Sequence, residues 1–253
     1  PQEQLLNQPK LIMKQRFSSC SSFLRASKDH NDQNQRLVYN LQSLCHRTNP
    51  NIAMKAQMLH KPAPIESSPL QWIDYQQPSP ADDELLIKVS ACGVCHTDLH
   101  VTEGDLPAPM LPIIPGHQIV GVIKSAGKDA TRFQQGTRVG IPWLHQTCGE
   151  CEYCLHGQEN LCEHALFTGY TAHGGFAEYT TIRADFAVPL PDELSDEEVA
   201  PLLCAGVVGY RSMRLSDVEP GERLGLYGFG ASAHICIQIA RHWNCEVYAF
   251  TRS

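Results

Sequence analysis

The chain has 253 residues, of which 42% are apolar and 19% are charged, and its formal net charge at pH 7 is −7. This composition predicts a soluble globular protein with a sizeable core, and the acidic balance argues against a polyanionic partner such as nucleic acid. No apolar run approaches the roughly 18 to 20 residues that cross a bilayer and no secretory signal is visible, so we expect no membrane association and a cytoplasmic location.

Residues 1–53 differ in composition from the rest of the chain. They contain seven Lys or Arg and three acidic residues, a balance of +4 that leaves −11 for residues 54–253. The segment is rich in Gln, Asn and Ser and has no sustained periodicity. It is compatible with an organelle transit peptide, a disordered extension or translation from a misplaced upstream start, and we favour the last two because Met54 resembles a natural beginning. We therefore predict an unrelated extension at 1–53.

The next part of the chain has the pattern of a β-rich domain. From Glu84 to Ala91 apolar residues alternate with polar or charged ones, which predicts a half-buried strand. Four further short β-like runs follow, each bounded by Gly, Pro or polar residues, at 119–124, 137–142, 176–182 and 186–190. Several short strands at irregular spacing favour a rolled-up β domain over a parallel sheet.

The character of the sequence changes after residue 190. Ser195 and Glu198 form a capping-box pattern and predict the start of a helix. After Pro220-Gly221, a strand at 223–227, a glycine turn, a helix at about 231–243 and a second strand at 246–250 predict a βαβ unit.

Eleven cysteines are many for a cytosolic chain, and four of them crowd into positions 148–162. Two successive C-x-x-C steps place three sulfur atoms on a tight turn, and the return to the fourth gives the spacing of a tetrahedral Zn²⁺ site. Free or disulfide-paired cysteines and an iron–sulfur cluster are the alternatives. Because protein ligands would fill all four positions, we expect a structural zinc, held by Cys148, Cys151, Cys154 and Cys162.

A second set of possible ligands is dispersed: Cys95, His117 and Cys204. Taken alone, Cys204 after two leucines is more often a small core residue than a ligand, and a single His117 is more often a satisfied polar group. The surrounding sequence changes this interpretation. The motifs G-V-C-H-T-D-L-H at 93–100, P-G-H at 115–117, the four-cysteine segment, G-G-F-A-E-Y at 174–179 and L-C-A-G-V at 203–207 follow one another in this order.

In this order the motifs resemble the zinc-dependent alcohol dehydrogenases of the medium-chain dehydrogenase/reductase superfamily, with the bacterial and yeast-like enzymes most similar. The resemblance covers essentially all of 54–253. It implies an α/β fold class, with a GroES-like β-rich catalytic domain at 54–205 and the first βαβ part of a Rossmann dinucleotide-binding domain at 206–253. A complete member of the family continues beyond these elements, so we expect the sequence to be truncated at its C-terminus.

The resemblance assigns the dispersed residues to a catalytic zinc held by Cys95, His117 and Cys204, with one position left for water or alcohol. Zinc lowers the pKa of a bound hydroxyl and so helps an alcohol to lose its proton. Thr97 would accept this proton and His100 would pass it to solvent, whereas Asp98 would orient His117. The alternatives are that Asp98 only caps local backbone and that His100 is an ordinary surface histidine.

One residue departs from the family pattern. Many relatives have Glu after the ligand histidine, whereas this chain has Gln118. The amide removes a negative charge beside two thiolates, which could change ligand exchange, but we expect zinc binding to survive.

The glycine turn after the strand at 223–227 predicts dinucleotide binding. Gly228 would allow the tight turn, Gly230 would let a pyrophosphate approach the backbone, and Ala233 stands in the small third position of the motif. The resemblance adds His96 as a cofactor contact. The second strand ends in Thr251-Arg252 with no acidic residue, which slightly favours NADP over NAD, although Arg252 could be a plain surface charge.

The function predicted from these features is the reversible oxidation of an alcohol to an aldehyde or ketone, with hydride transfer to NAD(P). A zinc-free quinone or enone reductase of the same superfamily is a weaker alternative, and a catalytically inactive, zinc-binding remnant of a dehydrogenase is an alternative of another class. We expect a small-molecule alcohol or aldehyde as substrate and, by resemblance, a homo-oligomer, dimeric or tetrameric.

Overall fold

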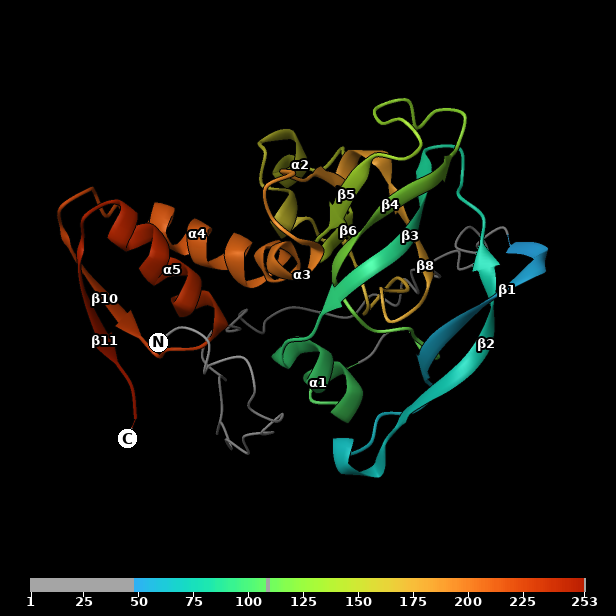
Figure 1. Cartoon of the computed structure of the whole chain (residues 1–253), viewed down its shortest axis with the longest axis horizontal. Helices are drawn as coiled ribbons and strands as arrows, with labels where there is room; N and C mark the ends of the chain where they lie inside the picture. Colours follow the sequence, from blue (N-terminus) through green and yellow to red (C-terminus); the bar gives the residue numbers. More distant parts are fainter. Residues whose placement is uncertain (1–47, 108–109, 253) are drawn as a thin grey trace, which may run out of the picture. The chain divides into compact units, whose positions relative to one another are not determined.

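The computed structural model describes residues 48–107 and 110–252 (Figure 1), and of residues 48–51 only the backbone. The predicted extension therefore lies almost entirely outside the described residues. The predicted end of the extension, residue 53, lies inside the first strand, β1, which spans Thr48–Leu59.

A five-stranded antiparallel sheet forms the centre of the β-rich part (Figure 1), with strand order β8-β3-β4-β5-β9. All five strands fall on segments where the sequence predicts β structure. Their bounds are β3 Glu84–Gly93, β4 Gln118–Ala126, β5 Arg138–Ile141, β8 Tyr179–Arg183 and β9 Val188–Pro189.

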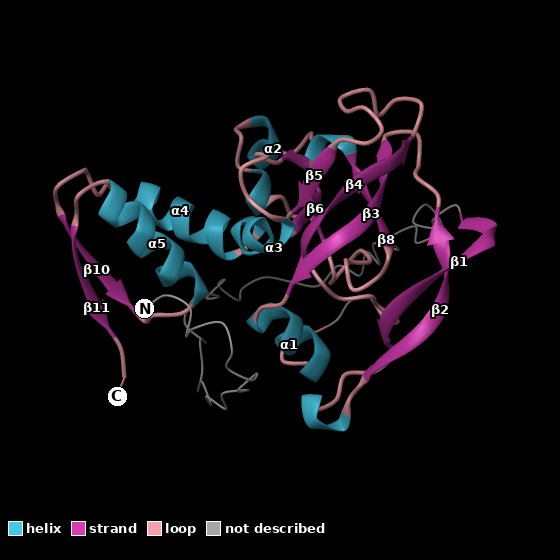
Figure 2. Cartoon of the chain, viewed as in Figure 1, coloured by secondary structure: helices cyan, strands magenta, loops and turns pink. Residues whose placement is uncertain are grey.

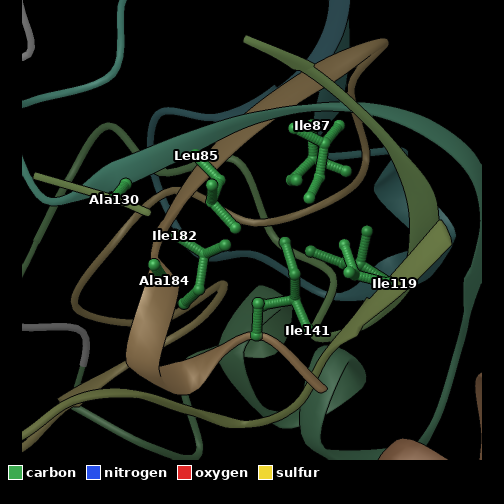
Figure 3. Packing of buried hydrophobic residues seen from close by; sticks show 10 residues of the cluster. Leu85, Ile87, Ile119, Ala130, Ile141, Ile182 and Ala184 are labelled. Atoms are coloured by element: carbon green, nitrogen blue, oxygen red, sulfur yellow. The ribbon is translucent and has the colours of Figure 1, made fainter. Parts of the chain in front are cut away.

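The main apolar core lies against this sheet. Figure 3 shows side chains from different strands, such as Leu85, Ile119 and Ile182, directed toward one another. The alternation along β3 holds for Leu85, Ile87 and Val89, since the first two belong to this core and Val89 packs against it. The pairing of β3 with β4 shifts register between Val89 and Ala91, and Ala91 packs against a different cluster. A β-bulge thus ends the predicted alternation.

Two further antiparallel pairs complete the β-rich part. The sequence does not predict β1 or its partner β2 (Leu70–Pro78), and both pack on a second core that contains Met54, Met58 and Ile114. The short strands β6 (Leu144–Gln146) and β7 (Leu166–Phe167) pair on either side of the four-cysteine segment.

Helices α4 and α5 follow the β-rich part (Figure 2), whereas the earlier helices are short. The α-helices are α1 His96–Glu103, α2 Glu152–Leu155, α3 Asp196–Val199, α4 Ala205–Leu215 and α5 Ala231–His242. The 3-10 helices are η2 Ile65–Ser67, η3 Glu159–Leu161, η4 Ala184–Phe186 and η5 Ala200–Leu203. No helix among the described residues is both long enough and apolar enough to span a bilayer.

The capping box at Ser195 is present, since the Ser195 side chain accepts the backbone N–H of Glu198 and the Glu198 side chain accepts that of Ser195. The helix that it starts is short. After α3 the chain passes through η5, which has Pro201 in its first turn, and Cys204 then precedes α4. Proline has no backbone N–H, so the hydrogen-bond pattern of α3 cannot continue through this position.

The predicted βαβ unit is confirmed. β10 (Arg223–Tyr227) and β11 (Glu246–Phe250) pair in parallel, and α5 connects them. Helix α4 crosses α5 closely at Gly209, where a Cβ atom would lie 2.8 Å from the sulfur of Cys236. The α/β class expected from the sequence therefore holds.

Candidate metal centres and dinucleotide turn

The residue that precedes helix α1 carries the first predicted ligand. The Cys95 sulfur accepts the backbone N–H of Thr97 at 3.4 Å, and the backbone N–H of Cys95 donates to Oδ2 of Asp98 at 2.8 Å. Cysteine thus takes the place of the usual Ser or Thr in a capping box. This arrangement fixes the Cys95 sulfur at the helix N-terminus.

Asp98 connects this helix start to the second predicted ligand. Its Oδ1 lies 3.1 Å from Nδ1 of His117 and also accepts the backbone N–H of Gly116 at 3.2 Å. Asp98 and His117 are buried, with 4% and 1% of their surface exposed. A buried carboxylate at Nδ1 favours the tautomer with its proton on that nitrogen, which leaves the Nε2 lone pair for another partner. Asp98 therefore both caps local backbone and orients His117.

Three donor atoms converge at this point. Nε2 of His117 lies 3.4 Å from the sulfur of Cys95 and 3.4 Å from that of Cys204, and the two sulfur atoms are 4.0 Å apart. A tetrahedral zinc ion would place its sulfur ligands about 3.8 Å apart and its sulfur and nitrogen ligands about 3.6 Å apart. The observed distances fit such an ion.

The electrostatics of the set also suit a cation. The hydrogen bond from Cys204 is the main reason that the pKa of the Cys95 thiol falls to about 3, and the same contact raises the pKa of Cys204. Burial lowers the pKa of His117, but Asp98 and Cys95 together outweigh it and raise this pKa to about 9. The site thus stabilises positive charge between its donor atoms, and a divalent cation there would also favour the Cys204 thiolate.

The predicted proton relay residues lie on α1. Thr97 is partly buried beside Cys95, whereas the His100 side chain is 44% exposed, and its Nδ1 pairs with Oδ2 of Asp105 at 2.8 Å. The His96 ring is exposed and its centroid lies 6.0 Å from that of His100. The structure places His100 at the surface, as both interpretations of this residue require.

The four-cysteine segment brings its sulfur atoms together. The distances are 3.6 Å for Cys162 to Cys148, 3.9 Å for Cys148 to Cys154 and 3.5 Å for Cys151 to Cys154. All four sulfur atoms lie within 4.8 Å of one another. The nine cysteines in the described part of the chain, these four among them, form no disulfide. Backbone N–H groups, that of Glu150 first, lower the pKa of Cys148 to about 6, so a thiolate is available to a metal at neutral pH.

This segment has little apolar packing of its own. From Cys148 to Cys162, the described side chains are half-buried or exposed except Cys162, and Tyr153, Leu155 and Leu161 are exposed. A loop of this kind lacks the apolar burial that normally stabilises a fold. A four-thiolate metal ion suits it, because metal binding supplies folding free energy.

The dinucleotide turn has the geometry that its glycines suggest. Gly228 has φ of 91°, a backbone conformation that side-chain-bearing residues rarely adopt, and its N–H donates to the Phe250 carbonyl at 2.8 Å. Gly230 precedes α5, and a Cβ atom built on it meets no heavy atom within 4 Å apart from its chain neighbours. The protein itself therefore leaves this position free for the close approach of a ligand. Ala233 is half-buried in the first turn of α5, and Thr251 and Arg252 follow β11 with exposed side chains.

Comparison with known proteins agrees with these features. Residues 81–192 match the family of the alcohol dehydrogenase GroES-like domain. Over 204 residues the chain is 50% identical to a probable alcohol dehydrogenase, AdhA, of Mycobacterium tuberculosis, an alignment that covers 79% of this chain and 59% of that protein. The chain is thus similar to alcohol dehydrogenases over 79% of its length.

Solved structures of dehydrogenases are also similar to this chain in fold. A cobalt- and zinc-bound thermostable alcohol dehydrogenase from Pyrobaculum aerophilum is 29% identical, with a TM-score of 0.72 over 79% of this chain and 60% of that one. CAD from Helicobacter pylori complexed with NADP(H) is 27% identical, with a TM-score of 0.72 over 80% of this chain and 60% of that one. The chain thus spans between a half and two thirds of the length of its relatives.

Trp143, which the sequence does not single out, borders the candidate metal-ligand set. Its ring meets the His117 imidazole edge to face at a centroid distance of 4.9 Å and stacks on Phe167 and Tyr170. A single tryptophan next to a three-residue strand has no periodic signal, so only the fold could reveal it. Gln118 is buried beside His117, and its Nε2 has no hydrogen-bond partner within the described part of the chain.

Proposed function

We propose that this chain is the zinc-binding part and the first nucleotide-binding part of an enzyme that reversibly oxidises an alcohol to an aldehyde or ketone, with hydride transfer to NAD(P). The observation that carries the proposal is the convergence of Cys95, His117 and Cys204, with His117 oriented by the buried carboxylate of Asp98. Two thiolates and a neutral imidazole form the ligand set expected of an alcohol dehydrogenase zinc with one open position.

When bound at this set, zinc lowers the pKa of an alcohol hydroxyl and polarises a carbonyl oxygen. The protein residues orient the groups around it. Asp98 keeps the proton of His117 on Nδ1, so that Nε2 stays a ligand. Thr97 accepts the alcohol proton through its hydroxyl, and His100 passes it to solvent at the exposed end of α1. These roles are extended from the family resemblance to the positions that match.

We infer that a second zinc binds Cys148, Cys151, Cys154 and Cys162 and has a structural role. The short sulfur–sulfur distances and the lack of buried apolar side chains in this segment support this role. A thermostable relative in the comparison is described as binding cobalt and zinc.

NADP is the proposed cofactor. Gly228 and Gly230 shape the turn before α5, whose N-terminus favours phosphate groups, and Thr251 and Arg252 follow β11 without an acidic residue. The Helicobacter pylori relative is complexed with NADP(H). We also propose His96 and Ala233 as cofactor contacts.

The domain division proposed from the sequence is a catalytic domain up to residue 205 and a nucleotide-binding part from 206. Since β1 begins at Thr48 and pairs with β2, we place the start of the catalytic domain at that strand. A dimeric or tetrameric assembly and a cytoplasmic location stay predictions.

Metal analysis and an activity assay test the proposal together. Zinc content of the purified chain is measured by mass spectrometry, for the wild type and for Cys95→Ser, Cys151→Ser and the control Cys245→Ser, whose cysteine lies outside both ligand sets. We expect two zinc ions per wild-type chain, one in each of the first two variants and two in the control. Formation of NADPH or NADH from ethanol and longer alcohols then tests turnover. A wild-type chain with no zinc would instead favour a zinc-free reductase.

A further inference from the structure

His173 joins two segments that are far apart in the sequence. Its Nδ1 accepts the backbone N–H of Ile114 at 3.1 Å, and its Nε2 lies 3.2 Å from the Tyr75 hydroxyl on β2. The Tyr75 and His173 rings meet edge to face at a centroid distance of 5.5 Å. One half-buried imidazole thus holds β2 and the chain at Ile114 together.

The segment that His173 contacts is the one that carries His117. Residues 174–176 donate backbone hydrogen bonds to the Ile114, Gly116 and Pro115 carbonyls, at 2.7, 2.9 and 3.0 Å. The contact is so close that a Cβ atom on Gly174 would lie 2.0 Å from the Gly116 oxygen. Ile114 and His117 are both 1% exposed. The bond from Ile114 to His173 therefore belongs to the support that holds the His117 segment in place.

This contact requires one protonation state of His173. A backbone N–H can only donate, so Nδ1 of His173 must hold a lone pair, and the ring proton of the neutral imidazole is then on Nε2. A doubly protonated ring would direct an N–H at the Ile114 N–H, and the hydrogen bond would be lost. The other titratable groups that line the same cavity are Tyr75 from β2, His145 from β6 and Tyr179 from β8.

We propose that His173 is a positioning residue for the metal ligand His117, and that it fulfils this role only as a neutral imidazole. The inference rests on the proposed metal set of Cys95, His117 and Cys204. Protonation of His173 at acidic pH releases the Ile114 N–H and loosens the segment that holds His117, in addition to any protonation of the ligands themselves. Metal retention should therefore depend on pH through a residue that does not touch the metal.

The test measures the rate at which the full chain releases zinc to a chromophoric chelator. The kinetic phase that disappears in Cys95→Ser belongs to the proposed catalytic set. Two variants of the contact are compared with the wild type. His173→Asn keeps an acceptor oxygen close to the position of Nδ1 but cannot be protonated, and His173→Leu removes the acceptor. His242→Leu, at the exposed end of α5, is the matched control.

We expect His173→Leu to release this zinc about fivefold faster than the wild type at pH near 8, the equivalent of one ordinary hydrogen bond. His173→Asn and His242→Leu should release it at the wild-type rate at this pH. Between about pH 8 and pH 5.5, where histidine titrates, the wild-type rate should rise more steeply than that of His173→Asn. The mild Asn variant, whose fold is checked by circular dichroism, keeps the test valid if His173→Leu fails to fold.

Two results overturn the inference while the proposed metal set stands. One is equal release by His173→Leu and the wild type, and the other is a pH profile of His173→Asn that coincides with that of the wild type. A wild-type chain in which Cys95→Ser removes no kinetic phase is a different result, since it overturns the metal set and the role of His173 together.

Discussion

Asp98 and His117 are buried side by side, with Oδ1 of the carboxylate 3.1 Å from Nδ1 of the imidazole. The same carboxylate accepts the backbone N–H groups of Cys95 and Gly116. One side chain therefore fixes the backbone at one proposed ligand and the ring orientation of another. This double role explains why a charged residue is buried at the start of a short helix, because it has three hydrogen-bond donors around it.

The first prediction concerns this carboxylate. Asp98→Asn has only one acceptor oxygen for three donors, so its amide must face at least one N–H group of the protein. We expect zinc affinity at the proposed catalytic set to fall by about tenfold to a hundredfold, the range found for residues that orient metal ligands. Equilibrium competition with a chelator measures it. Asp105→Asn, which changes an exposed partner of His100, is the matched control, and equal affinities of both variants would contradict the role of Asp98.

The second prediction separates the two glycines of the dinucleotide turn. Gly228 has φ of 91°, so Gly228→Ala should destabilise the fold by about 1–2 kcal/mol. Gly230 has φ of −97° and open space at its Cβ position, so Gly230→Ala should leave the melting temperature unchanged. Its methyl group would occupy the space that a pyrophosphate needs, and we expect NADPH binding to weaken by about tenfold or more.

Thermal unfolding and the fluorescence of bound NADPH measure these two effects. Undiminished NADPH binding by Gly230→Ala would show that the dinucleotide does not approach this turn. A large loss of stability in the same variant would mean that the protein itself requires glycine there.

The parts of the fold that the sequence predicts are those with a local signal. The unit β10–α5–β11 lies within a few residues of its predicted bounds, because glycines mark its turn and the strands are short and apolar. The convergence of the four cysteines could be predicted because they lie within positions 148–162 of the sequence. Along β3 the alternation is visible until the bulge after Val89, which depends on the pairing with β4 and not on β3 itself.

Helix α1 and strands β1 and β2 show why the rest could not be predicted. Helix α1 has cysteine in the capping position, so the usual capping residue is missing from its sequence. The helix also buries the polar residues Asp98 and Thr102, so its sequence lacks a clear apolar stripe. Strand β2 contains several polar residues, and its pairing with β1 and its packing near Phe176 involve distant parts of the chain. The roles of Trp143 and His173 depend on such contacts too.

The third prediction concerns the four-cysteine segment. If a metal stabilises this segment, Cys151→Ser or treatment with a chelator should unfold residues 148–162. The five-stranded sheet should remain folded, because its apolar core contains no buried side chain from the segment. Chymotrypsin should then cleave after the exposed Tyr153, Leu155 or Leu161 much faster than in the wild type. Mass spectrometry of the fragments identifies the sites.

Cys245→Ser serves as control for the loss of a thiol outside the segment. Protection of the segment from chymotrypsin after complete removal of zinc would contradict a structural role of the metal. Cleavage spread over the whole chain would show that the segment and the sheet unfold together.

The last prediction concerns acid stability near β5. Nε of Arg138 lies 2.6 Å from Oδ1 of Asp196, and its two remaining guanidinium nitrogens donate to the Pro191 and Leu194 carbonyls. Hydrogen bonds from Ser90 and then Arg138 lower the pKa of Asp196 below its ordinary value of 3.8. A carboxyl whose pKa is lower in the folded state stabilises the fold fully at pH values above its unfolded-state pKa, and this contribution disappears as the pH falls through its folded-state pKa.

Since the Asp196 side chain is 30% exposed, we expect the ion pair to contribute about 1 kcal/mol to the free energy of unfolding at neutral pH. Urea unfolding of the wild type and Asp196→Asn should differ by this amount at neutral pH and converge at strongly acidic pH. The exposed Asp82, paired with Lys128, gives the control Asp82→Asn, which should show a smaller difference. A gap between the wild type and Asp196→Asn that persists unchanged at strongly acidic pH would mean that packing, and not the carboxylate charge, carries the effect of the substitution.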